Sequence, residues 1–325
     1  MVSILHVGNI AGVPQELSKA QRKLGLKSDV LTFNLHPFVY EIDLYYPTKL
    51  PYSLTSLRYI GPSLRCAEKI FNLLRISNKY DVFHFHFSSI LPFGLDVLIW
   101  KFLRKKCVIH HHGSDIRYKG EPQIYSKFAD RIFVSTPDLL EWSPDAIWIL
   151  NPISLDEFSY VCVEHKDKSE NLSIVHAPSN RDIKGTKYVI NAVKVLKSEG
   201  YKIRLILVEN MSHKKAVEYY KQADIIVDWI NPKFGIYGMF SIESMAFGKP
   251  VICYLREDLQ KYYKNCPIVN ANPQNLTEKL RTLIEDYTLR KKIGKRGRKY
   301  VEQVHGANKV TEKVIKLYGN KEVKR

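Results

Sequence analysis

Short apolar runs alternate with helical patterns along most of this chain, and this alternation constrains its fold more than any other feature. The pattern begins at Val2 and restarts after Asn151, so it fills two stretches of about 150 residues each. Strands that alternate with helices form parallel sheets with helices packed on both faces. The sequence therefore predicts an α/β protein with two doubly wound, Rossmann-like domains in tandem.

The expected strands of the first stretch are 2–7, 29–33, 81–85, 107–111 and 131–135, and those of the second are 173–176, 203–208, 224–229 and 250–254. Helices are expected at 14–24, 185–198, 212–222, 240–247, 273–285, 289–304 and 307–317. The charged, turn-prone segment 151–170 separates the stretches. We place the first domain at 1–153 together with a C-terminal helix at about 308–325, and the second domain at 154–307.

Composition excludes several classes of protein. Hydrophobic residues make up 45% of the chain and charged residues 26%, which is typical of soluble globular proteins. No segment approaches the roughly 20 apolar residues of a membrane span. The N-terminus is interpreted as a strand rather than a signal peptide, and the five cysteines are widely spaced without a Cys-x-x-Cys pair. We therefore expect a cytoplasmic protein without disulfides.

The formal net charge of +17 is uneven along the chain. Residues 290–325 carry 13 basic and 3 acidic residues, and the densest run is 290–299. Such a run indicates either a solvated helix face or a surface for nucleic acid, anionic lipid or phosphorylated ligands. Neither a helix-turn-helix nor a zinc-finger pattern is present, so no nucleic-acid partner is expected.

Ligands of parallel sheets bind outside the carboxyl ends of the strands, which directs attention to four strand–helix junctions. The first junction contains Asn9 and Gly12 before a helix that begins near Pro14. Glycine there lets the backbone approach a ligand, and a helix N-terminus offers N–H groups to an anion.

The second junction, His110-His111-His112-Gly113-Ser114-Asp115, suggests a metal at first sight. Neighbouring residues of a strand point to opposite faces, so three consecutive rings cannot converge on one ion. His84 and His86 could share a face, but no thiolate or carboxylate cluster accompanies them. We therefore expect no metal and one functional imidazole, His112, as a hydrogen-bond donor or proton acceptor; a purely structural histidine is the alternative.

The third and fourth junctions lie in the second stretch. Arg181 and Lys184 place two cations beside a helix N-terminus, which suits a diphosphate. Gly238 precedes a helix whose N–H groups could bind phosphate, and Glu243 is expected in the first turn of that helix, where it could accept hydrogen bonds from a ribose diol.

Together these segments resemble the retaining glycosyltransferases of the GT-B fold, the family 4 or "glycosyl transferases group 1" class. Residues 238–252 are similar to the family signature F-G-x-x-x-x-E-x-M-A-x-G-x-P-V-I, and 179–186 to its N-R-x-x-K-G-x segment. His110–Asp115 resembles H-x-H-G-x-D. The resemblance implies two Rossmann-like domains whose sheets face each other across a cleft.

The resemblance also implies roles for individual residues. A nucleotide-sugar donor would bind mainly the second domain and an acceptor mainly the first, with His112 near the reacting carbon and Asn9 and Asp115 on the acceptor side. The implied donor-binding residues are Gly12, Arg181, Lys184, Gly238, Phe240, Ser241, Ile242 and Glu243. The implied reaction is transfer of a sugar to a glycan or lipid-linked acceptor, with neither metal nor other cofactor.

One position departs from the family pattern. The family has two glutamates in the spacing E-x7-E, and the position of the first is Gly235 in this chain. No Asp-x-Asp pair is present to hold a metal at a diphosphate. Two other activities stay open: a nucleotide-sugar 2-epimerase, and a protein that binds the nucleotide-sugar without turning it over.

Two segments bear on the acceptor. Residues 38–59 are rich in tyrosine and proline and are expected at the rim of an acceptor site. Residues 89–106 run from apolar to basic, which indicates either a buried helix with a charged end or a helix lying on anionic lipid. The second interpretation predicts peripheral association with a membrane.

Overall fold

The computed structural model describes residues 2–35, 40–47, 49–51, 60–162, 164 and 171–319. The chain divides into two compact units. The first unit contains Met1–Pro152 and Ala307–Arg325, and the second contains Ile153–Gly306; the limits expected from the sequence were 153 and 307. Much of the tyrosine-rich rim 38–59, part of the expected boundary 151–170 and the end of the expected C-terminal helix lie outside the described residues.

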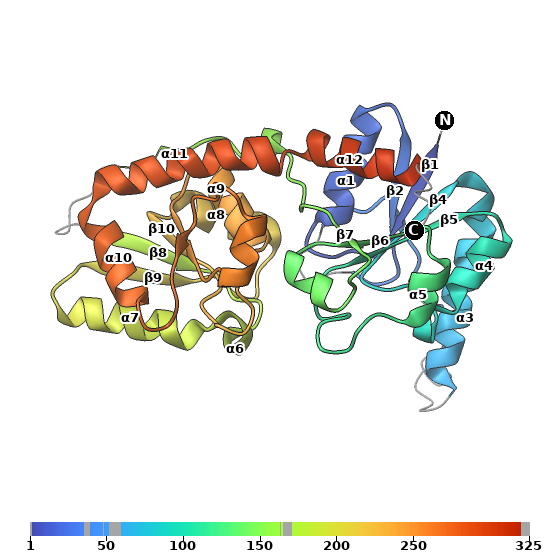
Figure 1. Ribbon diagram of the computed structural model, residues 1–325, viewed down its shortest axis with the longest axis horizontal. Coiled ribbons are helices and arrows are strands. Elements are labelled where there is room, and N and C mark those ends of the chain that lie inside the picture. Colours follow the sequence, from blue (N-terminus) through green and yellow to red (C-terminus); the bar gives the residue numbers. More distant parts are fainter. Residues whose placement is uncertain are drawn as a thin grey trace. The chain divides into compact units, whose positions relative to one another are not determined.

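The first unit is built on a seven-stranded sheet in the order β3-β2-β1-β4-β5-β6-β7, all parallel (Figure 1). The strands are β1 (Ser3–Val7), β2 (Lys27–Thr32), β3 (Leu44–Tyr45), β4 (Val82–His86), β5 (Lys106–His111), β6 (Arg131–Val134) and β7 (Ile147–Trp148). Its helices are α1 (Val13–Lys23), α3 (Gly61–Ile76), α4 (Asp96–Phe102), α5 (Gln123–Phe128) and α12 (Ala307–Gly319), with 3-10 turns η1 (Ser77–Lys79), η2 (Pro92–Gly94) and η3 (Pro137–Glu141).

The second unit is built on a five-stranded parallel sheet in the order β12-β11-β10-β8-β9. The strands are β8 (Leu172–His176), β9 (Ile203–Leu207), β10 (Ile225–Val227), β11 (Val251–Cys253) and β12 (Val269–Asn270). Its helices are α6 (Arg181–Lys184), α7 (Thr186–Ser198), α8 (His213–Gln222), α9 (Met239–Ala246), α10 (Leu276–Glu285) and α11 (Tyr287–Val304), with 3-10 turns η4 (Leu155–Glu157) and η5 (Glu257–Tyr262).

Both sheets are doubly wound, so the α/β prediction with two parallel sheets is confirmed. Each sheet has a switch point, the pair of neighbouring strands from which the chain adds further strands in opposite directions. The switch point lies between β1 and β4 in the first sheet and between β8 and β10 in the second. Crevices at the carboxyl ends of switch-point strands are the usual ligand sites of such sheets.

The faces of the first sheet follow from the two-residue period of its strands. Leu5, Phe83, Phe85 and Ile109 point to one face, where they pack with Trp100 of α4 in the main apolar core. The opposite face carries histidines from β1, β4 and β5. Helices α1 and α12, which pack against each other (Figure 1), contribute side chains that contact these histidines.

Three expectations need correction. The helical pattern 89–106 forms a helix only over Asp96–Phe102, because the buried Asp96 carboxylate accepts the N–H groups of Ile90 and Leu91 and holds the preceding segment in a turn. The expected helix 185–198 is preceded by a separate short helix, α6, since Gly185 adopts φ +76 between them. The three two-residue strands β3, β7 and β12 were not predicted.

Candidate functional site

The carboxyl edge of the second sheet gathers charged side chains from three consecutive strand–helix junctions. Lys184, at the end of α6, follows β8, and Asp228 follows β10. The Lys184 Nζ atom lies 2.7 Å from Asp228 Oδ1 and 4.0 Å from the centre of the Trp229 ring. Both charged side chains are buried, so the ammonium is compensated by a carboxylate and an aromatic face at the switch point.

Asp228 also connects this cation to α9. Its second oxygen accepts a 2.6 Å hydrogen bond from the Ser241 hydroxyl, which lies in the first turn of the helix. The side chains of Phe240, Ser241 and Ile242 are buried, so they can offer a ligand only their backbone groups. The first N–H groups of a helix lack partners within it, and Asp228 links this first turn to Lys184.

Gly238 is the N-cap of α9, and the described part of the chain leaves space beside it. A Cβ atom added to Gly238 would meet only Trp229 Nε1 within 4 Å, at 3.8 Å. That indole nitrogen is buried and has no hydrogen-bond partner among the described residues. No role was predicted for Trp229 from the sequence, although its position directly after a buried strand and Asp228 was the available signal.

Arg181 and Glu243 also have carboxylate or imidazole partners. The exposed Arg181 guanidinium donates two hydrogen bonds to Glu209, which lowers the pKa of that carboxyl. Glu243 Oε1 lies 2.8 Å from His213 Nε2 at the start of α8. Glu243 is the fifth residue of α9, so its expected place in the first turn is wrong; the buried second-turn position brings it beside α8.

Gly235 has a structural reason to be glycine. It adopts φ +62, and a Cβ atom there would lie 2.6 Å from the backbone nitrogen of Arg256. Arg256 N–H also donates a hydrogen bond to the Gly235 carbonyl. A glutamate at this position is incompatible with this backbone, so the chain lacks the first carboxylate of the E-x7-E pattern for a reason that involves the local fold.

In the first unit, His112 follows β5 and is held by two neighbours. Its Nδ1 lies 2.6 Å from the Ser135 hydroxyl and its Nε2 lies 3.0 Å from His86 Nδ1. Burial lowers the pKa of His112 to about 4, so the ring is neutral at pH 7. It can therefore accept or donate a hydrogen bond to a sugar only by exchanging one of these partners.

The other predicted residues of the first unit have internal contacts. Gly12 adopts φ +73 before α1, and a Cβ atom there would meet the Tyr40 ring at 3.2 Å. Asn9 accepts a hydrogen bond from Gln15. The Asp115 side chain is only 4% exposed and bonds His111 Nδ1 at 2.7 Å as well as the N–H groups of His112 and Gly113.

The basic run 290–299 in α11 has mixed roles. Arg290 is fully buried and donates to the carbonyls of Leu283 and Ile284 at the end of α10. Arg298 donates to the carbonyls of Phe158 and Ala246. The remaining lysines and arginine of the run are exposed, so much of it is a solvated helix face.

Comparison with known proteins agrees with this architecture. Residues 185–300 match the family described as glycosyl transferases group 1, a segment that includes Gly238 and Glu243 but begins after Lys184. No curated protein matches the chain in sequence.

Three solved structures have the same fold at low identity. An α-glucosyltransferase in complex with UDP and a 13-mer DNA containing an HMU base is 10% identical, covers 98% of this chain and 99% of its own, and has a TM-score of 0.62. AviGT4, a glycosyltransferase involved in avilamycin A biosynthesis, is 14% identical with coverages of 98% and 97% and a TM-score of 0.58. The UDP-GlcNAc 2-epimerase of Methanocaldococcus jannaschii is 12% identical with coverages of 93% and 98% and a TM-score of 0.54.

The structural likeness establishes the fold, and the family match covers the segment that carries β10 and α9. The chain therefore has the GT-B fold, and its residues 185–300 match the glycosyl transferases group 1 family.

Proposed function

We propose that the chain transfers a sugar, with retention of anomeric configuration, from a nucleotide-diphosphate sugar to a glycan or lipid-linked acceptor without a metal at the diphosphate. The observation that carries this proposal is the Lys184–Asp228–Ser241 chain of contacts, which joins a cation to the first turn of α9 at the switch point of the second sheet.

The chemistry follows from charge. Transfer leaves negative charge on the departing diphosphate, and preorganised cations and N–H dipoles stabilise that charge most effectively. Lys184 has three N–H donors, of which the contact to Asp228 uses one. Arg181 and the N-terminus of α9 supply further donors, so the donor diphosphate needs no ion. Glu243, paired with His213, is proposed to bind the ribose.

A thermal-shift panel of UDP-, GDP-, ADP- and dTDP-sugars tests the donor site, since a specific ligand stabilises the fold by mass action. We expect the shift to disappear in Arg181→Ala and Glu243→Ala. Arg281→Ala is the matched control, because Arg281 forms a similar pair, with three hydrogen bonds, with Glu199 after α7, at the opposite edge of the sheet. An unchanged shift in both site variants would reject the assignment.

Two alternatives are separated by product analysis. A 2-epimerase, the activity of one similar structure, would convert the donor in the absence of an acceptor. A binding protein would show a thermal shift but form no product. Transfer with retention predicts that product appears only with an acceptor and that its new bond has the anomeric configuration of the donor, as measured by NMR.

We propose an anionic lipid surface as the place where the acceptor is met. Large apolar side chains are exposed on η2, α4 and α5: Phe93 is 79% exposed and Phe102 87%, with Leu95, Leu98 and Phe128 nearby in the same elements. Lys101, Arg104 and Lys105 lie at the end of α4 or directly after it, although Lys101 pairs with Asp130 and Lys105 donates to the Tyr80 carbonyl. Among the described residues, no helix has the length and apolarity needed to cross a bilayer, so the association would be peripheral.

Vesicle flotation tests the membrane surface. The protein should float with vesicles that contain anionic lipid at low salt, and Phe93→Ser together with Phe102→Ser should abolish this. Val195→Ser in α7 is the control, since Val195 is also an exposed apolar residue but lies in the second unit. Equal flotation of all variants would contradict the proposal.

The absence of a nucleic-acid partner stays a prediction. The similar α-glucosyltransferase was solved with DNA, so a DNA acceptor is the rival to a glycan or lipid-linked one. Gel shifts at two salt concentrations distinguish them, because a phosphate-contacting protein loses affinity steeply with salt. We expect only weak retardation of duplex DNA, which disappears at the higher salt concentration.

A further inference from the structure

Five histidines meet on the face of the first sheet that α1 and α12 cover. His6 comes from β1, His84 and His86 from β4, and His110 from β5, with His112 directly after β5. The strand register pairs His6 with His84 and His86 with His110, so these rings contact each other across neighbouring strands, tilted by 39° and 36°. His111 points to the other face, as the alternation of side chains requires, so the cluster is formed by histidines of neighbouring strands rather than by consecutive residues of one strand.

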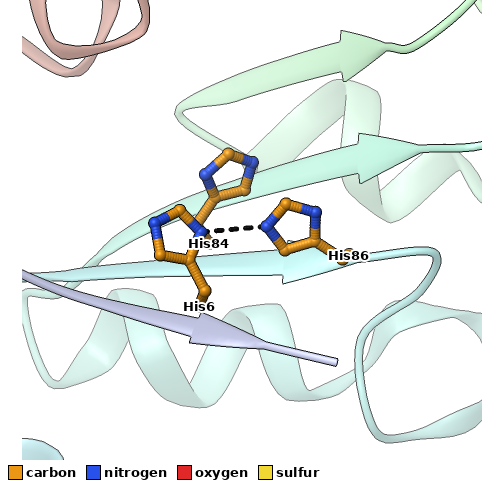
Figure 2. Close-up of side chains that lie close together, drawn as sticks. All are labelled: His6, His84 and His86. Atoms are coloured by element: carbon orange, nitrogen blue, oxygen red, sulfur yellow. Dashed lines mark hydrogen bonds between the residues drawn. The ribbon is translucent and has the colours of Figure 1, made fainter. Parts of the chain in front are cut away.

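Within this face, His6, His84 and His86 form a trio drawn in Figure 2. Each offers one ligand atom, and the three atoms lie within 4.8 Å of one another. All three side chains are at most 3% exposed. Figure 2 shows the rings of His6 and His86 facing each other, with 2.9 Å between His6 Nδ1 and His86 Nε2.

The outer nitrogen of each ring in this trio is already held. His6 Nε2 lies 2.9 Å from Gln21 Oε1, His84 Nδ1 lies 2.7 Å from the Tyr318 hydroxyl, and His86 Nδ1 lies 3.0 Å from His112 Nε2. Metal-binding histidines characteristically use their second nitrogen in this way, because the outer hydrogen bond fixes the ring.

The inner nitrogens are then His6 Nδ1, His84 Nε2 and His86 Nε2. The Ser28 hydroxyl donates to Gln21 Oε1, so this oxygen is an acceptor, His6 Nε2 carries its proton, and His6 Nδ1 presents a lone pair. His84 Nε2 is buried and has no hydrogen-bond partner among the described residues. A buried imidazole nitrogen without a partner is costly unless something binds it.

We propose that His6, His84 and His86 bind one divalent transition-metal ion, with Zn²⁺ as the preferred species. Neutral imidazole ligands suit zinc, copper and nickel, whereas magnesium and calcium require oxygen ligands. Three histidines leave one position of a tetrahedral zinc for a water molecule. The site lies in the first unit, so it is separate from the diphosphate-binding site proposed for the second unit, which uses no metal.

Protons balance without any net release. In the bound state His84 would carry its proton on Nδ1 and donate it to the Tyr318 hydroxyl, which leaves the Nε2 lone pair for the metal. The His86 proton on Nε2 would move to Nδ1, from which it donates to His112 Nε2, and the His112 proton would move to Nδ1, facing Ser135. The imidazoles that change tautomer remain neutral. Metal binding would therefore reverse the tautomer of His112, the residue proposed to approach the donor sugar.

A second trio, His86, His110 and His112, also has ligand atoms within 4.8 Å. We favour the first trio because its outer nitrogens have three separate partners. In the second trio, the outer nitrogens of His110 and His112 both depend on the Ser135 hydroxyl, at 3.2 and 2.6 Å. The test must distinguish the two trios, and His84 and His110 each belong to only one of them.

The experiment uses the full chain, treated with a chelator and dialysed against Zn²⁺, with bound metal measured by mass spectrometry. We expect one zinc per chain, with three imidazole nitrogens at about 2.0 Å in the X-ray absorption spectrum. His84→Gln should lose the zinc, and His110→Gln should retain it. Absence of stoichiometric zinc, or loss with His110→Gln and retention with His84→Gln, overturns the proposal.

Tyr318→Phe keeps the test decisive if His84→Gln fails to fold. This change preserves the three ligands and removes only the phenol that holds His84 Nδ1. We expect a loss of about 10- to 100-fold in zinc affinity, the usual effect of removing an outer partner. An unchanged affinity in a folded Tyr318→Phe protein counts against His84 as a ligand.

Discussion

In both units, an aspartate–serine hydrogen-bond pair joins the two switch-point strands at their amino ends. The buried polar side chains at the carboxyl ends of these strands differ between the units. In the first unit, Asp81 Oδ2 accepts from the backbone N–H and the hydroxyl of Ser3, at 2.9 and 2.8 Å. In the second, Asp224 Oδ2 accepts from the same two groups of Ser173, at 2.8 and 2.9 Å. Each serine opens the same pattern, Ser-Ile-x-His, at residues 3–6 and 173–176.

The carboxyl ends diverge. In the first unit, buried neutral imidazoles bond one another in a row that runs from Gln21 through His6 and His86 to His112. In the second unit, His176 bonds the Val227 carbonyl and the Thr186 hydroxyl. The polar groups buried at the carboxyl ends of its strands include the charged side chains of Lys184 and Asp228. A buried neutral side chain needs only a hydrogen-bond partner, so several imidazoles can bond one another in a row. A buried charged side chain needs an opposite charge in contact with it.

Asp228→Asn breaks the comparison most strongly. The variant leaves the buried Lys184 ammonium without a counter-charge, and we expect a loss of about 3 to 5 kcal/mol in the free energy of unfolding, measured with urea. Tyr318→Phe, which removes a neutral partner in the first unit, should cost about 1 kcal/mol. Asp258→Asn, which removes an exposed partner of Arg256, should cost less than about 1 kcal/mol. Equal losses of unfolding free energy in all three variants would refute the distinction between the buried charge pair of the second unit and the neutral imidazole row of the first.

Gly235→Glu is expected to have the next largest effect. The change would restore the missing glutamate of the E-x7-E pattern, but it places a side chain at φ +62 against the backbone of Arg256. Left-handed strain and overpacking together should cost about 3 kcal/mol of unfolding free energy. Activity should fall with the folded fraction, whereas a stable and more active Gly235→Glu enzyme would show that this loop rearranges freely.

Much of the architecture could be predicted from the sequence because each sheet strand of more than two residues carries its own apolar run. The two-residue strands β3, β7 and β12 could not, since a pair of residues has no period to detect. The residues of the donor-side site were also proposed from the sequence, from their positions after strands and from the family resemblance.

The partners of those residues were harder to predict. Asp228 and His213 contact Lys184 and Glu243 from 44 and 30 residues away, and only the order of strands in the sheet brings them together. The histidines of the first sheet likewise make contacts that the sequence pattern alone does not predict. His110 and His112 share a face by the period of one strand, but their contact with His86 depends on the register between β4 and β5.

Asp115→Asn sharpens the comparison, since it tests a buried pair of opposite charge in the first unit, between Asp115 and His111, next to His112 in the chain. Burial opposes protonation of His111, but the carboxylates of Asp115 and Glu121 outweigh it and raise the His111 pKa. A raised folded-state pKa means that this stabilisation is present below the ordinary histidine pKa of 6.5 and is lost as pH rises through the raised value.

We therefore expect Asp115→Asn to cost about 2 kcal/mol near pH 6 and less near pH 9, measured by urea unfolding at both values. His213→Gln in the second unit serves as a control for general effects of histidine titration, because it leaves the Asp115 pair intact. A cost for Asp115→Asn that grows with pH would show that His111 is neutral in the folded protein.

Gly238→Ala should have the smallest effect on stability. The variant therefore tests donor binding at the N-terminus of α9 without a large change in the free energy of unfolding. Gly238 has φ −123 and ψ −164, which alanine adopts freely, and an added Cβ would only touch Trp229 Nε1. Alanine reduces the entropy of the unfolded chain but caps a helix less well than glycine, so the unfolding free energy should change by less than about 0.5 kcal/mol. If the donor phosphate occupies the space beside this glycine, the same methyl group should abolish the thermal shift given by the nucleotide-sugar. A variant that is as stable as the parent and still binds the donor would show that the phosphate lies elsewhere, and would leave Lys184 and Asp228 as a structural pair equivalent to the neutral row of the first unit.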